Sequence, residues 1–112
     1  MDEMVTELIE DLTIELTITD TNFNSDLLTV KVNNAVKEVA KVRNYPSHYT
    51  PEMIGSDIQK FYSQARSISL YDYNVIGSEY EKSHSENNIN RTYIDRKELF
   101  AGIIPLSRTM KK

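Results

Sequence analysis

Several residue types that support particular kinds of functional site are scarce or missing in this chain. Cysteine is absent, which excludes disulfide bonds and thiolate metal sites. The only glycines are Gly55, Gly77 and Gly102, and none belongs to a phosphate-binding loop or to the G-x-S-x-G turn of a serine hydrolase. No apolar run approaches the roughly 20 residues of a membrane span, and the acidic start is unlike a secretory signal. We therefore expect no membrane segment and no secretion.

Length and charge distribution narrow the class further. The 112 residues suit a single domain, 1–112, and 39% hydrophobic residues suffice for a modest core. Residues 1–26 contain eight acids and no Lys or Arg, whereas the rest of the chain has thirteen bases against nine acids. A surface with two signs of charge favours self-association or docking on a charged partner. A solvated acidic helix face is the alternative interpretation.

The first apolar pattern is compatible with two structures. Helical spacing relates Val5, Leu8, Ile9, Leu12 and Leu16. Residues 12–19, LTIELTIT, also alternate between apolar and polar side chains, which is typical of a strand. We therefore expect a helix to about Ile14 that continues as an extended segment. The sequence DTNFNSD then predicts a turn, because Asn, Asp and Ser side chains hydrogen-bond to the nearby backbone.

A second helix is predicted by an apolar stripe through Leu28, Val32, Ala35, Val36, Val39 and Val42. Ser25 or Asp26 is expected to cap its start. Its end is expected at about Arg43, because a residue before proline, here Tyr45, is pushed out of the helical region.

A third helix is predicted to begin at Thr50-Pro51, with Thr50 as the N-cap and Pro51 in the first helical position. Its apolar stripe contains Ile54, Ile58, Phe61, Tyr62, Ala65 and Ile68. We expect Tyr71 to carry the stripe to its end and Tyr73 to face an interface, with Gly77 as the C-terminal cap.

Two appendages follow these helices. The first is a polar arm at about residues 78–93, SEYEKSHSENNINRTY, which is long for a connection in a small domain. Asp95 and Glu98 then resemble a capping box for a short helix ending at Gly102. Pro105 prevents continuation, which leaves residues 103–112 as an apolar and then basic tail. The predicted class is all-α: a small bundle of three main helices plus a short fourth helix, with a long polar loop and an extended C-terminal tail.

Neither catalysis nor metal binding is indicated by the residues. Ser83 and His84 are sequence neighbours, and adjacency does not supply the geometry of a catalytic triad. The only histidines, His48 and His84, belong to no metal-binding motif, and the acids of the polar arm match no EF-hand loop. We expect no enzyme, cofactor or metal. The second helix carries a modest basic stripe, so a small helical DNA-binding or regulatory protein is the alternative.

Two long segments resemble a known family. They are residues 26–46, DLLTVKVNNAVKEVAKVRNYP, and residues 69–108, which contain LYDYN, SHSEN and LFAGIIP. In this order they resemble the head–tail connector (adaptor, or DNA-packaging) proteins of tailed phages and prophages of Gram-positive bacteria. The resemblance covers roughly residues 5–108.

The resemblance implies a structural protein of the virion neck, assembled in the cytoplasm of the host bacterium. Such adaptors form a homo-oligomeric ring, commonly of twelve copies, beneath the portal protein. The ring extends the DNA channel and docks a downstream stopper or tail-completion protein. Genomic DNA passes through it without sequence-specific binding.

Two sets of residues are candidates for these contacts. The candidates for the portal interface lie in the tail: Ile103, Ile104, Leu106, Arg108, Lys111 and Lys112. Packing of the tail on its own helices is the alternative. The candidates for contacts within the ring are Glu79, Glu81, His84, Glu86, Arg91, Lys31, Lys37, Lys41 and Arg43. The N-terminal acids are expected either to meet such basic positions or to line the channel, where they would repel DNA phosphate.

Overall fold

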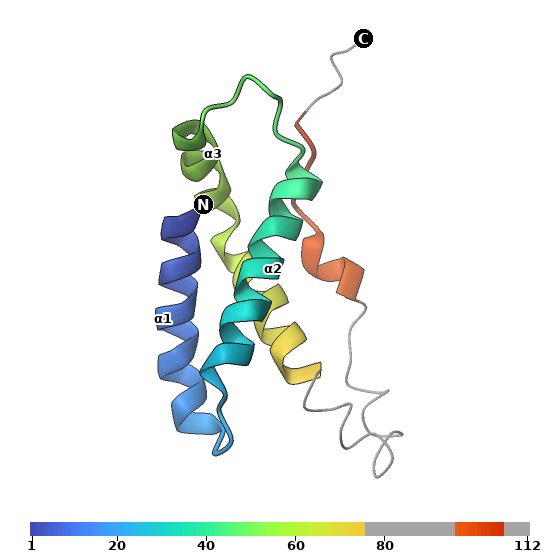
Figure 1. Ribbon diagram of the computed structural model, residues 1–112. Coiled ribbons are helices and arrows are strands. Elements are labelled where there is room, and N and C mark those ends of the chain that lie inside the picture. The colour runs from blue at the N-terminus through green and yellow to red at the C-terminus, as the bar shows by residue number, and fades with distance from the viewer. Residues whose placement is uncertain (76–95, 107–112) are drawn as a thin grey trace.

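The computed structural model describes residues 1–75 and 96–106, and these are all helical or connecting segments. The main helices are α1 (Asp2–Thr19), α2 (Ser25–Arg43) and α3 (Pro51–Ile58). A 3₁₀ turn, η1 (Gln59–Phe61), continues α3 into the helical residues 62–75. A second 3₁₀ segment, η2 (Arg96–Phe100), lies beside α2 (Figure 1). The predicted all-α class is confirmed, whereas the polar arm, the cap at Gly77 and residues 107–112 lie outside the described residues.

The core lies between α1, α2 and the long helical segment 51–75, which crosses behind them (Figure 1). It is built from side chains that recur every three or four residues on each element, so that each helix buries one face. Its largest fully buried members are Met4, Leu8, Leu12, Leu28, Ile58, Ile68, Val32, Val36 and Val39. The apolar stripes predicted for the second and third helices therefore do face the core.

The expected extended segment after Ile14 is wrong, because α1 continues as a helix to Thr19. Leu12 is completely buried and Leu16 is 4% exposed, whereas Ile14 and Ile18 are 65% and 79% exposed. A strand would have placed all four on one face. The segment is helical because Leu12 and Leu16 extend the buried row that Met4 and Leu8 begin.

Asparagine residues cap α2 at both ends. Asn24, rather than Ser25 or Asp26, is the N-cap, and its side-chain oxygen accepts a hydrogen bond from the backbone N–H of Leu27. Asn44 ends the helix in the left-handed conformation, at a φ of 62°, which asparagine tolerates better than most residues. The predicted cap of α3 is confirmed, since Thr50 accepts from the N–H of Met53 at 3.1 Å.

Of the two tyrosines at the end of the third helical segment, Tyr73 rather than Tyr71 is the buried one. Tyr73 is 6% exposed, whereas Tyr71 is only half-buried. The Tyr73 hydroxyl donates to Asp20 Oδ2 and accepts from the backbone N–H of Asn24, both at 3.0 Å. Its ring packs on Phe23, so Tyr73 fixes the turn between α1 and α2 rather than facing an interface.

The short fourth helix is confirmed in place, but it is 3₁₀ rather than α-helical. It ends before Gly102, whose φ of +93° belongs to the region that glycine occupies most readily. The chain then turns so that Ile103 enters the core, where it is 6% exposed. Ile103 therefore packs inside the chain's own core. This agrees with the alternative interpretation, in which the tail packs on its own helices.

The buried row of α1 leads to a stability prediction. Leu12→Ala should lower the free energy of unfolding by about 2–5 kcal/mol, because it leaves a cavity in the core. Ile14→Ala, two residues away on the exposed side, should change it by less than about 0.5 kcal/mol. Urea unfolding followed by circular dichroism measures both. Equal losses in the two variants would show that the segment is paired as a strand instead.

Candidate functional site

Three arginines connect segments that are far apart in the sequence, and each is held by acidic side chains. The pairs join different parts of the bundle: Arg43 with Asp57, Arg66 with Asp11 and Glu15, and Arg96 with Asp72 and Glu38. Because guanidinium groups donate in several fixed directions, each pair sets orientation as well as proximity. These contacts decide which charges remain available to a partner.

The Arg43–Asp57 pair is the least exposed of the three, with side chains 15% and 11% exposed. Arg43 donates from Nε to Asp57 Oδ2 at 2.9 Å and from Nη2 to Oδ1 at 3.0 Å. Tyr45 adds a hydrogen bond from its hydroxyl to Asp57 Oδ2 at 2.7 Å. The Arg43 guanidinium, followed by Tyr45 and Lys60, lowers the pKa of Asp57 from 3.8 to about 2, against the effect of burial.

Arg43 also holds the end of the chain that follows η2. Its Nη1 donates to the carbonyl oxygen of Ile104 at 2.7 Å, and its own carbonyl accepts from the N–H of Leu106 at 2.6 Å. Arg43 was a candidate for contacts within the ring. In the folded chain its guanidinium is occupied by Asp57 and Ile104, so it serves to hold the subunit together.

Arg96 fixes the beginning of the same segment. Its Nε and Nη2 donate to the two carboxylate oxygens of Asp72, at 2.8 and 2.7 Å, and Nη2 also reaches Glu38 Oε1 at 2.6 Å. The hydrogen bonds that Arg96 donates to Asp72 are the main cause of the raised pKa of Arg96, and the guanidinium lies over the ring of Phe100. Hence η2 is attached both to α2 and to the helical segment 62–75.

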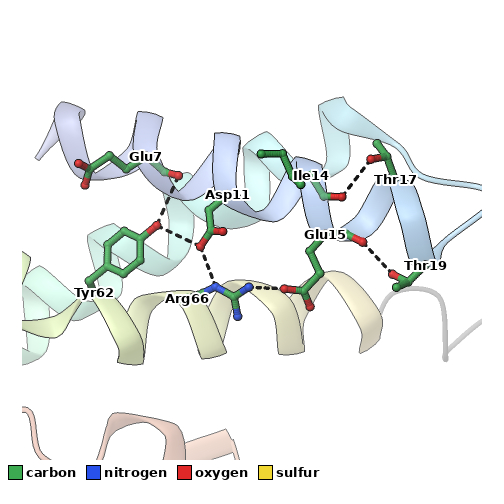
Figure 2. Close-up of polar contacts among 8 residues, drawn as sticks. All are labelled: Glu7, Asp11, Ile14, Glu15, Thr17, Thr19, Tyr62 and Arg66. Carbon is green, nitrogen blue, oxygen red and sulfur yellow. Dashed lines mark hydrogen bonds and ion pairs between the residues drawn. The ribbon is translucent and has the colours of Figure 1, made fainter.

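Arg66 pairs with one side of the acidic helix α1, as Figure 2 shows. It donates to Asp11 at 2.9 Å and also to Glu15 one turn further on. Tyr62 donates to Asp11 Oδ2 at 3.3 Å, and burial followed by the charge of Asp11 raises the pKa of the Tyr62 hydroxyl. The acids of α1 therefore fall into two groups. Asp11 and Glu15 form ion pairs that hold α1 against the third helical segment.

The remaining acids of α1 lie toward solvent. Glu3, Glu7 and Glu10 are exposed. The side chain of Glu10 forms no hydrogen bond or ion pair within residues 1–75 and 96–106. Glu7 and Glu10 border an open groove of about 530 Å³ between α1 and the third helical segment, together with Asp11, Ile14, Gln59 and Tyr62. This acidic groove with an exposed isoleucine at its edge is shaped for contact with another macromolecule rather than for enclosing a small ligand.

The basic candidates on α2 differ in accessibility. Lys37 and Lys41 are exposed and form no ion pair among the described residues, whereas Lys31 is half-buried. Lys41 borders a second groove, of about 460 Å³, between α2 and η2. The other ring candidates, Glu79, Glu81, His84, Glu86 and Arg91, lie outside the described residues, so the structure does not test them.

The candidates for the portal interface in the tail also differ in their exposure to solvent. Ile104 is 67% exposed and Leu106 is half-buried beside the end of α2. Ile103 is in the core, and a partner reaches it only if the segment leaves the bundle. Arg108, Lys111 and Lys112 are beyond the described residues.

The sequence alone did not predict that two acids of α1, Asp11 and Glu15, pair with an arginine of the same chain. A signal for it exists: Asp11 and Glu15 are four residues apart and flank the buried row, a spacing that lets one arginine reach both. Their partner Arg66 lies 51 residues beyond Glu15, and nothing in the local sequence connects the two.

Comparison with known proteins adds no assignment. No protein-family model, no curated sequence and no solved structure matched the chain significantly. Within the part of the chain that the structure describes, no three potential metal ligands come together, and no helix has the length and apolar character of a membrane span. The function is therefore argued from the surfaces and from the sequence.

The lowered pKa of Asp57 predicts an acid-sensitive fold. A carboxyl whose pKa falls from 3.8 to about 2 on folding contributes its stability fully above pH 4 and loses it as the pH drops from 4 to 2. The shift corresponds to about 2 kcal/mol. Asp57→Asn should lower the free energy of unfolding by about that amount at pH 7 and remove that part of the acid dependence.

Urea unfolding at pH 7 and between pH 2 and 4 measures this effect. Glu10→Gln is the matched control, since it removes an exposed carboxylate without an ion pair and should change stability by less than about 0.5 kcal/mol. An Asp57→Asn variant as stable as the unmodified chain at pH 7 would contradict the role given to this pair.

Proposed function

We propose that this chain is a structural head–tail connector (adaptor) protein of a tailed phage. In this proposal it forms a ring under the portal, extends the DNA channel and docks the stopper or tail-completion protein, without a catalytic step or a cofactor. The resemblance of residues 26–46 and 69–108 suggests the class. The all-α fold is compatible with it, and the arrangement of the C-terminal part of the chain gives the strongest structural support.

That support comes from residues 96–106, which we call the C-terminal strap. The strap is attached at its start by Arg96, which reaches Asp72 and Glu38. It is attached at its end by Arg43, which hydrogen-bonds to Ile104 and Leu106. Between these points, Ile103 is buried. Charged hydrogen bonds at both ends and an apolar contact between them hold the strap along α2 (Figure 1).

The strap brings residue 106 to a defined place at the C-terminal end of α2. Ile104 and Pro105 are exposed there, and the basic residues Arg108, Lys111 and Lys112 follow in the sequence. We assign to these residues the contact with the portal: Ile104 supplies apolar area, and the basic side chains meet acids of the partner. Ile103 is removed from the predicted set because the core already holds it.

The alternative of a DNA-binding protein is less well supported. The basic stripe considered for a recognition helix included Arg43, and that guanidinium is occupied by Asp57 and Ile104. The nearby Glu38 pairs with Arg96. Of the other members of that stripe, Lys31 is half-buried, and Asn34, Lys37 and Lys41 are exposed. The lysines provide attraction for phosphate, which leaves Asn34 alone suited to a base-specific contact.

The proposal predicts the effect of two deletions. Removal of residues 107–112 should abolish binding to the cognate portal protein and leave the unfolding temperature unchanged, because it retains Ile103 and the rest of the described core. Removal of residues 103–112 should abolish binding and also lower the unfolding temperature by several degrees, because it takes Ile103 from the core. Size-exclusion chromatography with light scattering and thermal circular dichroism measure the two effects.

The same chromatography gives the mass of the unmodified chain alone and mixed with portal. A ring or a complex with portal is the expected result. A chain that stays monomeric at all concentrations, ignores portal and shifts a defined DNA duplex would overturn the proposal in favour of DNA binding.

A further inference from the structure

The solvent side of α1 carries acids followed by isoleucines. Glu7, Glu10, Ile14 and Ile18 recur at intervals of three or four residues, so they follow one side of the helix, and we call them the α1 stripe. Ile14 and Ile18 are 65% and 79% exposed, and Ile18 is the most exposed of the large apolar side chains among the described residues. The carboxylate of Glu7 receives only a neutral hydrogen bond, from Gln59. The stripe thus presents unneutralised negative charge beside apolar area.

The solvent side of α2 has a related pattern in the reverse order. Val30, Asn34, Lys37 and Lys41 also recur at intervals of three or four residues, opposite the buried face, and we call them the α2 stripe. Val30 is 53% exposed. Along the chain, the α1 stripe therefore runs from acidic to apolar, and the α2 stripe runs from apolar to basic.

The two stripes have the same length. Each covers twelve residues, so its first and last members are about 16 Å apart along the helix axis. Placed antiparallel, they bring together four pairs: Glu7 with Lys41, Glu10 with Lys37, Ile14 with Asn34, and Ile18 with Val30. The parallel arrangement would place acids against Val30 and isoleucines against lysines. Charge complementarity therefore selects the antiparallel arrangement.

This arrangement also has the symmetry of a ring. Within one chain α1 and α2 already run antiparallel (Figure 1). If α1 of a second copy lies antiparallel to α2 of the first, the α1 helices of the two copies point the same way. Neighbouring copies then keep one orientation, as rotation about a ring axis requires, and each copy uses one stripe on either side. Such a contact is heterologous and can repeat until the ring closes.

We propose that the α1 stripe docks antiparallel on the α2 stripe of a second copy of this chain. The inference rests on the proposed function, which expects a ring, and it identifies the surfaces and the register that build the ring. It assigns the N-terminal acids to contact between subunits rather than to the lining of the channel. It also gives a use to the exposed isoleucines, which the fold of one chain leaves in solvent.

A disulfide test reads the register directly, because the natural chain contains no cysteine. The variant with both Ile18→Cys and Val30→Cys should form a ladder of covalent oligomers when it is oxidised at conditions of assembly, with portal present if assembly requires it. Non-reducing gel electrophoresis measures the ladder. The control variant, Ile18→Cys with Lys41→Cys, puts the two thiols at opposite ends of the paired stripes, beyond the span of a disulfide. It should give less than a tenth of the ladder.

Charge reversal provides the second measurement. Glu7→Lys and Lys41→Glu should each weaken self-association at least tenfold in sedimentation velocity, and the two changes together should restore it to within threefold. Circular dichroism checks that each variant keeps the helical fold. Restoration by the double variant is the result expected of a direct pair. Single reversals without effect on association would overturn the proposed pairing.

The outcomes separate this inference from the function on which it rests. If the unmodified chain forms rings or binds portal but the Ile18→Cys, Val30→Cys variant gives a single band, the register is wrong and the adaptor function stands. If the unmodified chain neither self-associates nor binds portal, the proposed function itself fails. A strong ladder from the control pair would also overturn the antiparallel register.

Discussion

The pairing of Arg43 with Asp57 is the interaction on which most of the described structure depends. It joins the last turn of α2 to α3 and positions Tyr45. Through Ile104 and Leu106 it also holds the strap. Little-exposed ion pairs persist only where hydrogen bonds replace the lost water, and here every donor group of the guanidinium has an acceptor. Breaking this one pair therefore loosens the junction of α2 with α3, the position of Tyr45 and the strap at the same time.

Much of the fold follows from the sequence because helical stripes are local patterns. The cap at Thr50, the end of the short fourth helix before Gly102 and the stripes of the second and third helices could be predicted, since each depends on neighbouring residues. The exceptions share one cause. LTIELTIT satisfies two periods, and only the neighbouring helices decide that Leu12 and Leu16 are buried together while Ile14 is exposed. Likewise, Tyr73 rather than Tyr71 is buried, because Asp20 and Asn24 lie within hydrogen-bond distance of the Tyr73 hydroxyl.

The candidate surfaces were predictable in charge but not in detail. The sequence shows that one end of the chain is acidic and that α2 carries lysines. It does not show that Arg66 takes two of the acids or that Asp57 takes Arg43, since these partners are 14 to 55 residues apart. The internal pairs leave other charges over: Glu7, Glu10, Lys37 and Lys41 are among the charged side chains that form no ion pair within residues 1–75 and 96–106. Three of the large apolar side chains that are exposed among the described residues, Ile14, Ile18 and Val30, lie on the same two stripes.

The anchoring of Leu106 also sets a geometric limit on whatever the tail binds. A chain advances at most about 3.6 Å per residue, so Lys112 lies within about 20 Å of Leu106 in any conformation. Leu106 is itself held by the carbonyl of Arg43, at the end of α2. In the proposed contact with the portal, the basic residues are therefore tethered at a fixed point on the bundle. That contact would select a docking site by its distance from the end of α2 as well as by its charge.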